Sequence, residues 1–290
     1  MLVRKSQILS AIGGLTLTFL TFLPLMAWLV NYTSQHTQLL HSFIVLAFAG
    51  AVLIYGQHEK ISLTFSYNHS VLLGFLVSYI LLGMIYLSKL TVLYIPALIA
   101  ATYAWCHFLF GSRYNRIITA LLVAFSFFLG LIIIFPTIDW PLRILAGDIS
   151  HQIFEIAGSE TRLLLFNESE LFAEPTLVLT MDGRPFEVAP ECNGFGVLSA
   201  STLLSVLLIV YYKPAPFMGF LFLSGSILSA FVLNLIRILI IVYLAPWAGD
   251  HYFAMHEVIG ISVFWFALMG IWMFAQRFEP KNSETIENIK

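Results

Sequence analysis

Residues 117–135 read "IITALLVAFSFFLGLIIIF" and carry no charged side chain. About 20 consecutive apolar residues are needed for a helix to cross the hydrocarbon core of a bilayer. The stretch has nearly that length and contains only two hydroxyl side chains, which a helix tolerates in lipid. It therefore predicts a transmembrane helix, and the flanking sequence shows whether it is one of many.

The whole chain has the same character. Of its 290 residues, 59% are hydrophobic and 10% are charged, whereas soluble domains carry about 25% charged residues. This composition excludes a soluble protein and predicts an all-α polytopic membrane protein with about eight transmembrane helices. The expected spans are 8–30, 39–56, 69–88, 90–110, 117–135, 194–212, 216–244 and 254–275. No small-residue cleavage site ends the first span, so we interpret it as a retained helix.

The distribution of lysine and arginine predicts the orientation, because cytoplasmic segments carry the excess of these residues. With a cytoplasmic N-terminus, nine lie in the inner segments and four in the outer segments. Both termini are therefore expected in the cytoplasm, in a cytoplasmic (inner) membrane. The net charge of −2 gives no indication of a nucleic-acid partner.

Four regions follow from this topology: a five-span region 1–135, an external loop 136–193, a three-span catalytic region 194–275 and a cytoplasmic tail 276–290. Asp139 is a candidate N-cap in the loop. After it, Leu142, Leu145, Ile149, Ile153 and Ile156 recur at helical spacing, which predicts an interfacial helix. Further on, Asp182-Gly183 between β-prone runs predicts a short β-hairpin, with Pro185 on an edge strand.

Three residues in the late spans call for an explanation. Cys192 precedes the sixth span, Arg237 lies past the middle of the seventh, and His256 begins the eighth. By the predicted topology all three lie toward the outer face. Each also has an ordinary interpretation: a cysteine can fill a small apolar space, an arginine can reach the headgroups, and an interfacial histidine can simply be solvated. Ionisable groups within a membrane nevertheless favour a functional hypothesis. Cys106, surrounded by aromatic residues, is interpreted as a filler.

The three side chains together can perform acyl transfer. A thiolate attacks a carbonyl carbon, a guanidinium stabilises the resulting oxyanion, and an imidazole returns a proton to the leaving amine. We take Asn193, Asn234 and Glu257 as supporting residues; Asn234 lies one helical turn before Arg237 and could hold it or donate a hydrogen bond. No cofactor is expected. The sequence "HEVIG" lacks the second histidine of a zinc protease helix, so no metal site is expected either.

The motifs "ECNG", "NLIR" and "HEVIG", in this order, resemble those of the exosortase/archaeosortase family of membrane transpeptidases, as does "DWPLR" at 139–143. The likeness covers residues 136–274. It implies Cys192 as nucleophile, Arg237 as transition-state stabiliser and His256 as proton shuttle. It also implies substrates that are exported proteins with a C-terminal transmembrane sorting signal, as in PEP-CTERM proteins, and an acceptor nucleophile in the envelope. Two alternatives stay open: a cysteine protease without transfer activity, and a non-enzymatic transporter or assembly subunit.

Overall fold

The computed structural model describes residues 5–56, 63–166, 176–181, 183–187 and 194–278. Three residues around the predicted nucleophile, Glu191, Cys192 and Asn193, lie outside the described residues, as do residues 279–290 of the tail. What the structure describes is mostly helical, with one small sheet.

Each predicted span overlaps one helix, and most of the ends agree within a few residues. They are α1 (Lys5–Gln35), α2 (Thr37–Tyr55), α3 (His69–Ser88), α4 (Tyr94–Phe110), α5 (Asn115–Ile156), α6 (Phe195–Tyr212), α7 (Pro216–Ala248) and α8 (Tyr252–Ala275). Short 3-10 helices are η1 (Thr91–Leu93), η2 (Gly111–Tyr114), η4 (Gly249–His251) and η5 (Gln276–Phe278).

Six stretches of the described chain are long and apolar enough to cross a membrane. Two of them, Thr91–Ile156 and Pro216–Phe278, contain 66 and 63 residues. Each joins two of the predicted spans into one stretch. The chain is therefore a helical membrane protein with several spans, and the predicted count of eight is not confirmed.

The chain divides into two compact units, one formed by Met1–His36 with Leu46–Leu129 and the other by Thr37–Val45 with Gly130–Lys290. In the first unit α3 packs closely on α4, where a β-carbon on Gly74 would lie 3.0 Å from the Ala104 β-carbon. The Ser78 hydroxyl donates to the Ala97 carbonyl across the same helix pair at 2.9 Å. Helix α1 joins this unit through the indole of Trp105, which donates to the Thr18 hydroxyl at 3.0 Å.

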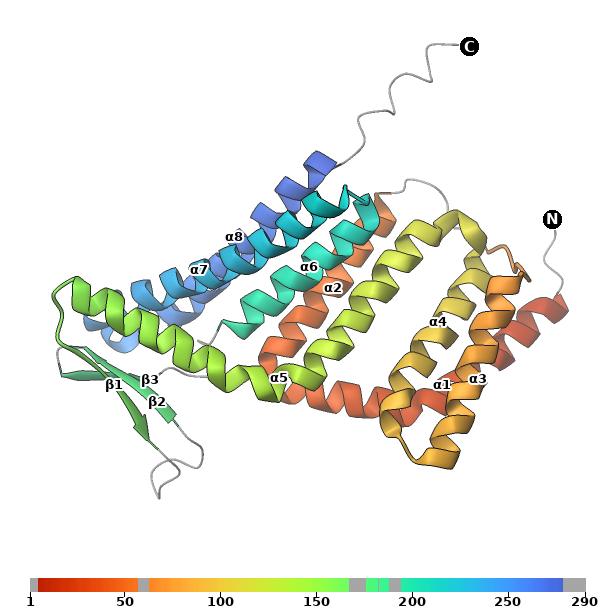
Figure 1. Ribbon diagram of the computed structural model, residues 1–290, viewed down its shortest axis with the longest axis horizontal. Coiled ribbons are helices and arrows are strands. Elements are labelled where there is room, and N and C mark those ends of the chain that lie inside the picture. The colour runs from red at the N-terminus through yellow and green to blue at the C-terminus, as the bar shows by residue number, and fades with distance from the viewer. Residues whose placement is uncertain (1–4, 57–62, 167–175, 182, 188–193, 279–290) are drawn as a thin grey trace, which may run out of the picture. The chain divides into compact units, whose positions relative to one another are not determined.

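In the second unit α6, α7 and α8 lie side by side (Figure 1). Helix α6 is the most deeply enclosed of the three, with Leu203 and Leu207 at 0% exposure. Its apolar residues are therefore covered by protein around much of its circumference, as expected for a helix at the centre of a bundle.

Helix α5 corrects one prediction. We expected a separate helix to begin at Asp139, but α5 runs without a break from Asn115 to Ile156, through Pro136 and Pro141. Asp139 does not cap a helix; its carboxylate accepts from Arg143 one turn later, at 2.6 Å. Each proline removes one hydrogen bond and favours a bend rather than a stop.

The second half of α5 is amphipathic, as predicted, but the face that packs on protein differs from the predicted apolar stripe. Ala146, Ser150 and Phe154 are buried, whereas Leu145 and Ile156 are 45% and 87% exposed. An exposed apolar stripe of this kind suits a lipid-facing position. Its placement at the membrane surface stays a prediction.

The predicted hairpin is present and is part of a larger sheet. Strands β1 (Thr161–Phe166), β2 (Thr176–Met181) and β3 (Arg184–Glu187) pair antiparallel in the order β1-β2-β3. The turn joins Met181 to Arg184, and Gly183 has a φ of 78°, which glycine adopts without strain. Pro185 lies on the edge strand β3, as predicted. Strand β1 was not predicted.

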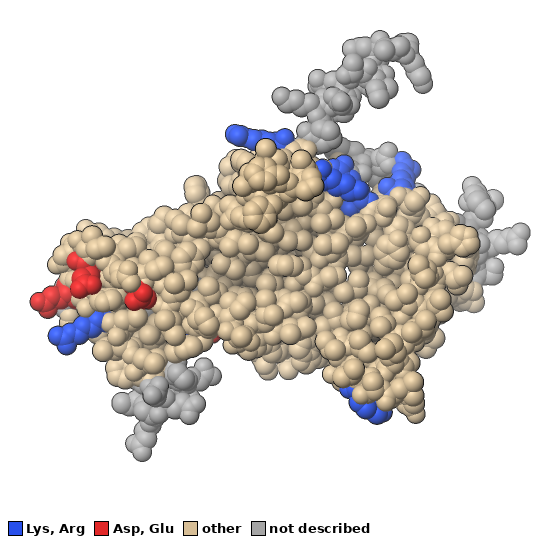
Figure 2. Space-filling view, in the orientation of Figure 1, with Lys and Arg blue, Asp and Glu red and all other residues tan. Residues whose placement is uncertain are grey.

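The sheet packs against α5 and α7. Leu177 and Leu179 of β2 share one buried cluster with Ala146 of α5 and with Leu235 and Ile238 of α7. Among the described residues of this part of the chain, exposed acidic ones include Asp148, Glu155 and Glu160. Figure 2 shows acidic side chains gathered over the end of α5 and the strands, while most of the visible face is uncharged. The sheet thus covers the side of α7 that carries Leu235 and Ile238.

Candidate active site

Helix α7 directs two polar side chains into the bundle. Asn234 is fully buried and Arg237 is 9% exposed, and the two lie one turn apart, on a shared face. A snorkelling arginine would carry its charge outward to the headgroups. Arg237 instead turns toward α8: a β-carbon on Gly260 would lie 3.0 Å from its Nη2 and 3.2 Å from its Cζ and Nε.

Gly260 therefore forms the seat for the guanidinium on α8. A larger residue would occupy the space that the planar group fills, so the helix backbone is accessible here only because the side chain is absent. Gly260 lies four residues after His256, on the same face of α8. The contact therefore places Arg237 next to the helix face that carries His256.

His256 is partly buried on α8, and its ring centre lies 6.2 Å from that of Tyr252. Its position one turn before Gly260 brings the imidazole toward the same region as the guanidinium. Glu257 is exposed. As the next residue along the helix it projects in a different direction from His256, so the structure does not bring it to these side chains.

A second glycine joins α6 to α7. Gly194 is the N-cap residue of α6, with a φ of 83°, and it is buried. A β-carbon there would lie 2.6 Å from Nδ2 and 2.7 Å from Cγ of Asn234. The start of α6 therefore rests directly on Asn234, in a backbone conformation that side-chain-bearing residues rarely adopt.

Cys192 and Asn193 lie outside the described residues; along the chain they immediately precede Gly194. The adjacent first turn of α6 presents backbone N–H groups without intrahelical partners, an environment that favours negative charge. The ring of Phe195 meets that of Phe135 on α5 at 4.7 Å between centres, and this contact encloses the first turn from another side.

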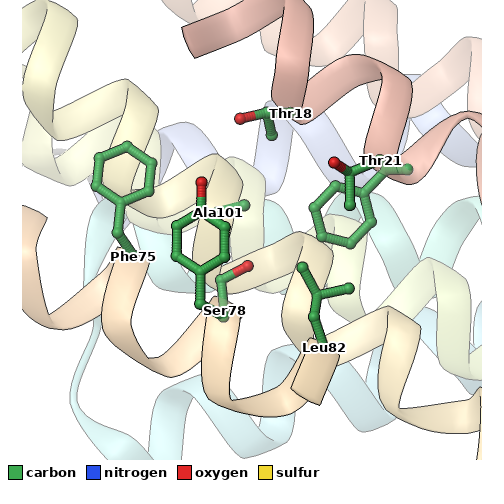
Figure 3. A pocket seen from close by; sticks show the side chains of 8 residues that line it. Thr18, Thr21, Phe75, Ser78, Leu82 and Ala101 are labelled. Carbon is green, nitrogen blue, oxygen red and sulfur yellow. The ribbon is translucent and has the colours of Figure 1, made fainter. Parts of the chain in front are cut away.

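The other candidate sites on the described chain carry no comparable chemistry. A small pocket in the first unit is lined by α1, α3 and α4 (Figure 3). Its hydroxyl groups serve the helices: Thr18 donates to Gly14 and Thr21 to Leu17, both at 2.9 Å. Cys106 is half-buried in α4. Within the described ranges, no three histidine, cysteine or acidic side chains are grouped so that they could hold a metal ion.

These observations define a class of protein: a polytopic helical membrane protein in which α6, α7 and α8 bring three sequence motifs together. The chain matches the transmembrane exosortase family over residues 28–273, which is most of its length, and it belongs to that family. The resemblance predicted from the motifs is thereby confirmed. The match begins well before residue 136 and so includes α2. Membership indicates a transmembrane transpeptidase. Searches for curated relatives and for solved structures gave no significant match.

Sequence reasoning missed the two glycines. Gly194 and Gly260 stand in the motifs "ECNG" and "HEVIG", yet only the cysteine and the histidine were singled out as candidates. A signal was available, because a glycine within or at the end of an apolar helix often marks a close approach of another group.

Proposed function

We propose that the protein is a membrane cysteine transpeptidase that cleaves the C-terminal sorting signals of exported proteins. Cys192 is the nucleophile, Arg237 stabilises the transition state and His256 transfers the proton. The substrate carries a short motif, a transmembrane helix and a basic tail. The site faces the outer side of the cytoplasmic membrane, with both termini in the cytoplasm, so that the substrate is met after export.

The observation that carries this proposal is the pair of glycine contacts on α7. Gly194, two residues after Cys192, rests on Asn234, and Arg237 rests on Gly260, one turn after His256. The three motifs are far apart in sequence and adjacent in space. If Cys192 only filled an apolar space and His256 were only solvated, a buried arginine between their helices would have no explanation.

The reaction proceeds in two halves. The Cys192 thiolate attacks the carbonyl carbon of the scissile amide, a C–S bond forms, and the carbonyl oxygen becomes an oxyanion beside the Arg237 guanidinium. The C–N bond then breaks, and His256 gives its proton to the departing amine. An acceptor nucleophile next attacks the thioester, loses its proton to His256 and releases the thiolate. If the acceptor is water, the outcome is hydrolysis.

The supporting residues act on this arrangement. Asn234 holds the first turn of α6 in place and so fixes the approach of Cys192 to Arg237. Asn193 adjoins the nucleophile. Glu257 is exposed and projects away from these side chains, so no role in the reaction is proposed for it. Burial of Arg237 strengthens its action, because charges interact more strongly where water is scarce.

The test uses Cys192→Ser, with Cys106→Ser as a matched control because the chain has two cysteines. The readout is the size of an exported reporter with a C-terminal helix and basic tail. Cys192→Ser should leave the reporter unprocessed, since a hydroxyl ionises far less readily than a thiol, while Cys106→Ser processes it normally. Normal processing by Cys192→Ser would refute the nucleophile and favour a non-enzymatic subunit.

The identity of the product separates transfer from hydrolysis. Mass spectrometry of the cleaved reporter should show an envelope group attached at the new C-terminus. A free carboxylate on all of the product would instead assign the chain as a protease without transfer activity.

A further inference from the structure

Strand β1 is an edge of the sheet with open backbone hydrogen-bonding groups. It pairs with β2 from Thr161 to Phe166, and the strand order β1-β2-β3 leaves it outermost. In an antiparallel ladder, alternate residues direct their N–H and C=O groups away from the partner strand. Over the described ranges, the backbone of residues 161–165 makes no backbone hydrogen bond beyond the pairing with β2. The edge therefore offers donors and acceptors with which an extended chain can pair.

The two edges of the sheet differ in their protection against further pairing. Natural edge strands avoid unwanted pairing by being short and by carrying charged residues or proline. Strand β3 has four residues and contains the charged Arg184 and also Pro185, which has no N–H group to donate. Strand β1 has six residues, and its last four, 163–166, read "LLLF" without a charge or a proline. The sheet is thus protected at β3 and unprotected at β1.

Contacts with α5 hold β1 in place. The hydroxyl of Thr161 is hydrogen-bonded to Nδ1 of His151 at 2.6 Å, which fixes the start of the strand. Further along, a β-carbon on Gly147 would lie 3.3 Å from Cδ1 of Leu163, so the helix and the strand are in close contact there. A surface that is already ordered binds a partner without the entropic cost of ordering itself. Strand β1 is therefore a preorganised edge.

The side chains of β1 add apolar contacts beside these backbone groups. Leu164 and Leu165 are 39% and 55% exposed, whereas Leu163 packs against the buried cluster between the sheet and its helices. Successive side chains of a strand point to opposite faces of the sheet, so Leu164 and Leu165 border an added strand on both faces. Apolar pairs between neighbouring strands stabilise a sheet. The edge therefore fits an extended peptide that carries apolar side chains.

The sheet is attached to the helix that carries the proposed transition-state stabiliser. Leu177 and Leu179 of β2 share one buried cluster with Leu235 and Ile238 of α7. Arg237 lies between these last two residues in the chain. A peptide paired with β1 would extend the same sheet that packs on this turn of α7. This continuity favours, as the occupant of the edge, a peptide on which the proposed site acts.

We propose that β1 captures the substrate by strand addition: an extended stretch of the exported protein, ahead of its transmembrane helix, pairs with the outer edge of β1. This inference rests on the proposed function, in which the short motif precedes that helix and the sheet lies on the outer side of the membrane. Main-chain hydrogen bonds give affinity for an extended chain, and contacts with alternate side chains give specificity. Pairing with β1 thus orients the peptide before it reaches the reacting groups.

The test is photo-crosslinking in membranes with the full-length Cys192→Ser enzyme, which leaves the reporter described above uncleaved. The photoreactive residue benzoylphenylalanine replaces Leu164 or Leu165, one on each face of the sheet. The matched control carries it in place of Leu145 on α5, which is 45% exposed. Positions 164 and 165 should form an adduct with the reporter, which mass spectrometry locates ahead of its transmembrane helix. Position 145 should form no such adduct.

Single prolines in the reporter give a readout that is specific to strand pairing. Proline lacks the N–H group, and only alternate residues of a strand direct this group toward one neighbour. A proline whose missing N–H faces away from the neighbouring strand is tolerated on an edge. Prolines placed one at a time through the stretch ahead of the transmembrane helix should therefore lower the adduct yield at every second position.

Three results would overturn the inference: no reporter adduct from positions 164 and 165, an equal adduct from position 145, or a proline profile without the two-residue period. Adducts only between two copies of the enzyme would also overturn it, because β1 would then pair with itself. Where the parent enzyme cleaves the reporter, any of these results rejects capture by β1 alone. A parent enzyme that does not cleave the reporter rejects the proposed function, and this inference with it.

Discussion

The guanidinium of Arg237 lies against the backbone of α8 at Gly260, with Nη2 3.0 Å from the position that a β-carbon would take. The absence of one side chain thus decides where this buried charge is held. A charge fixed in advance stabilises a transition state without reorganisation during the reaction. The glycine of "HEVIG" is therefore as much a part of the proposed site as its histidine.

Gly260→Ala tests this relationship. The new methyl group would displace the guanidinium, and misplacement of a reacting group by about 1 Å can cost about 10²-fold in rate. We expect reporter processing to fall by that order while the protein inserts normally. Gly270→Ala on the same helix is the matched control, because a β-carbon there meets nothing within 4 Å. Equal activity of the two variants would contradict the proposed seat for Arg237.

Gly194→Ala combines a clash with backbone strain. Its β-carbon would lie 2.6 Å from Asn234 Nδ2, and its φ of 83° disfavours alanine by roughly 1–2 kcal/mol. We expect processing to be lost, because the first turn of α6 must shift and carry Cys192 with it. Gly183→Ala separates the two causes, since its φ is 78° and a β-carbon there meets nothing within 4 Å. If Gly183→Ala is equally inactive, strain in the backbone and not contact with Asn234 is responsible.

The helices were predictable from the sequence because the length of an apolar run sets the length of a span. The expected span 69–88 coincides with α3 (His69–Ser88), and 216–244 differs from α7 (Pro216–Ala248) only at its end. The hairpin was predictable because Asp182-Gly183 is a local turn signal. These features depend on neighbouring residues, which a sequence displays directly.

The missed features depend on contacts between distant residues. Strand β1 was not predicted because Phe166 and Thr176, which pair at its end, are separated by too many residues for a tight-turn signal. The prediction of a helix start at Asp139 was wrong, because its carboxylate accepts a hydrogen bond from Arg143 and does not cap a helix. In the site, the reactive residue types could be read from the motifs. The close contacts of Gly194 with Asn234 and of Gly260 with Arg237 arise only when the helices pack.

Arg237→Lys distinguishes a transition-state role from simple charge. A lysine keeps the charge but lacks the planar set of donors that lies flat on Gly260. We expect processing to fall by about 10²–10³-fold, as for the loss of an oxyanion donor, with normal insertion. Arg277→Lys, at an exposed position, should retain full activity. Near-normal processing by Arg237→Lys would show that any nearby cation suffices.

The orientation of the site is tested by the accessibility of the two thiols. An impermeant maleimide reagent applied to intact spheroplasts should label Cys192, because the proposed topology places the start of α6 at the outer face. Cys106 should be spared, since it is half-buried within α4, a helix apolar enough to lie in the membrane. Comparing Cys106→Ser, which leaves Cys192 as the sole target, with Cys192→Ser assigns the label to one thiol. Labelling of Cys192 only after the membrane is opened would reverse the topology and place the site on the cytoplasmic side, where a substrate would be met before its export.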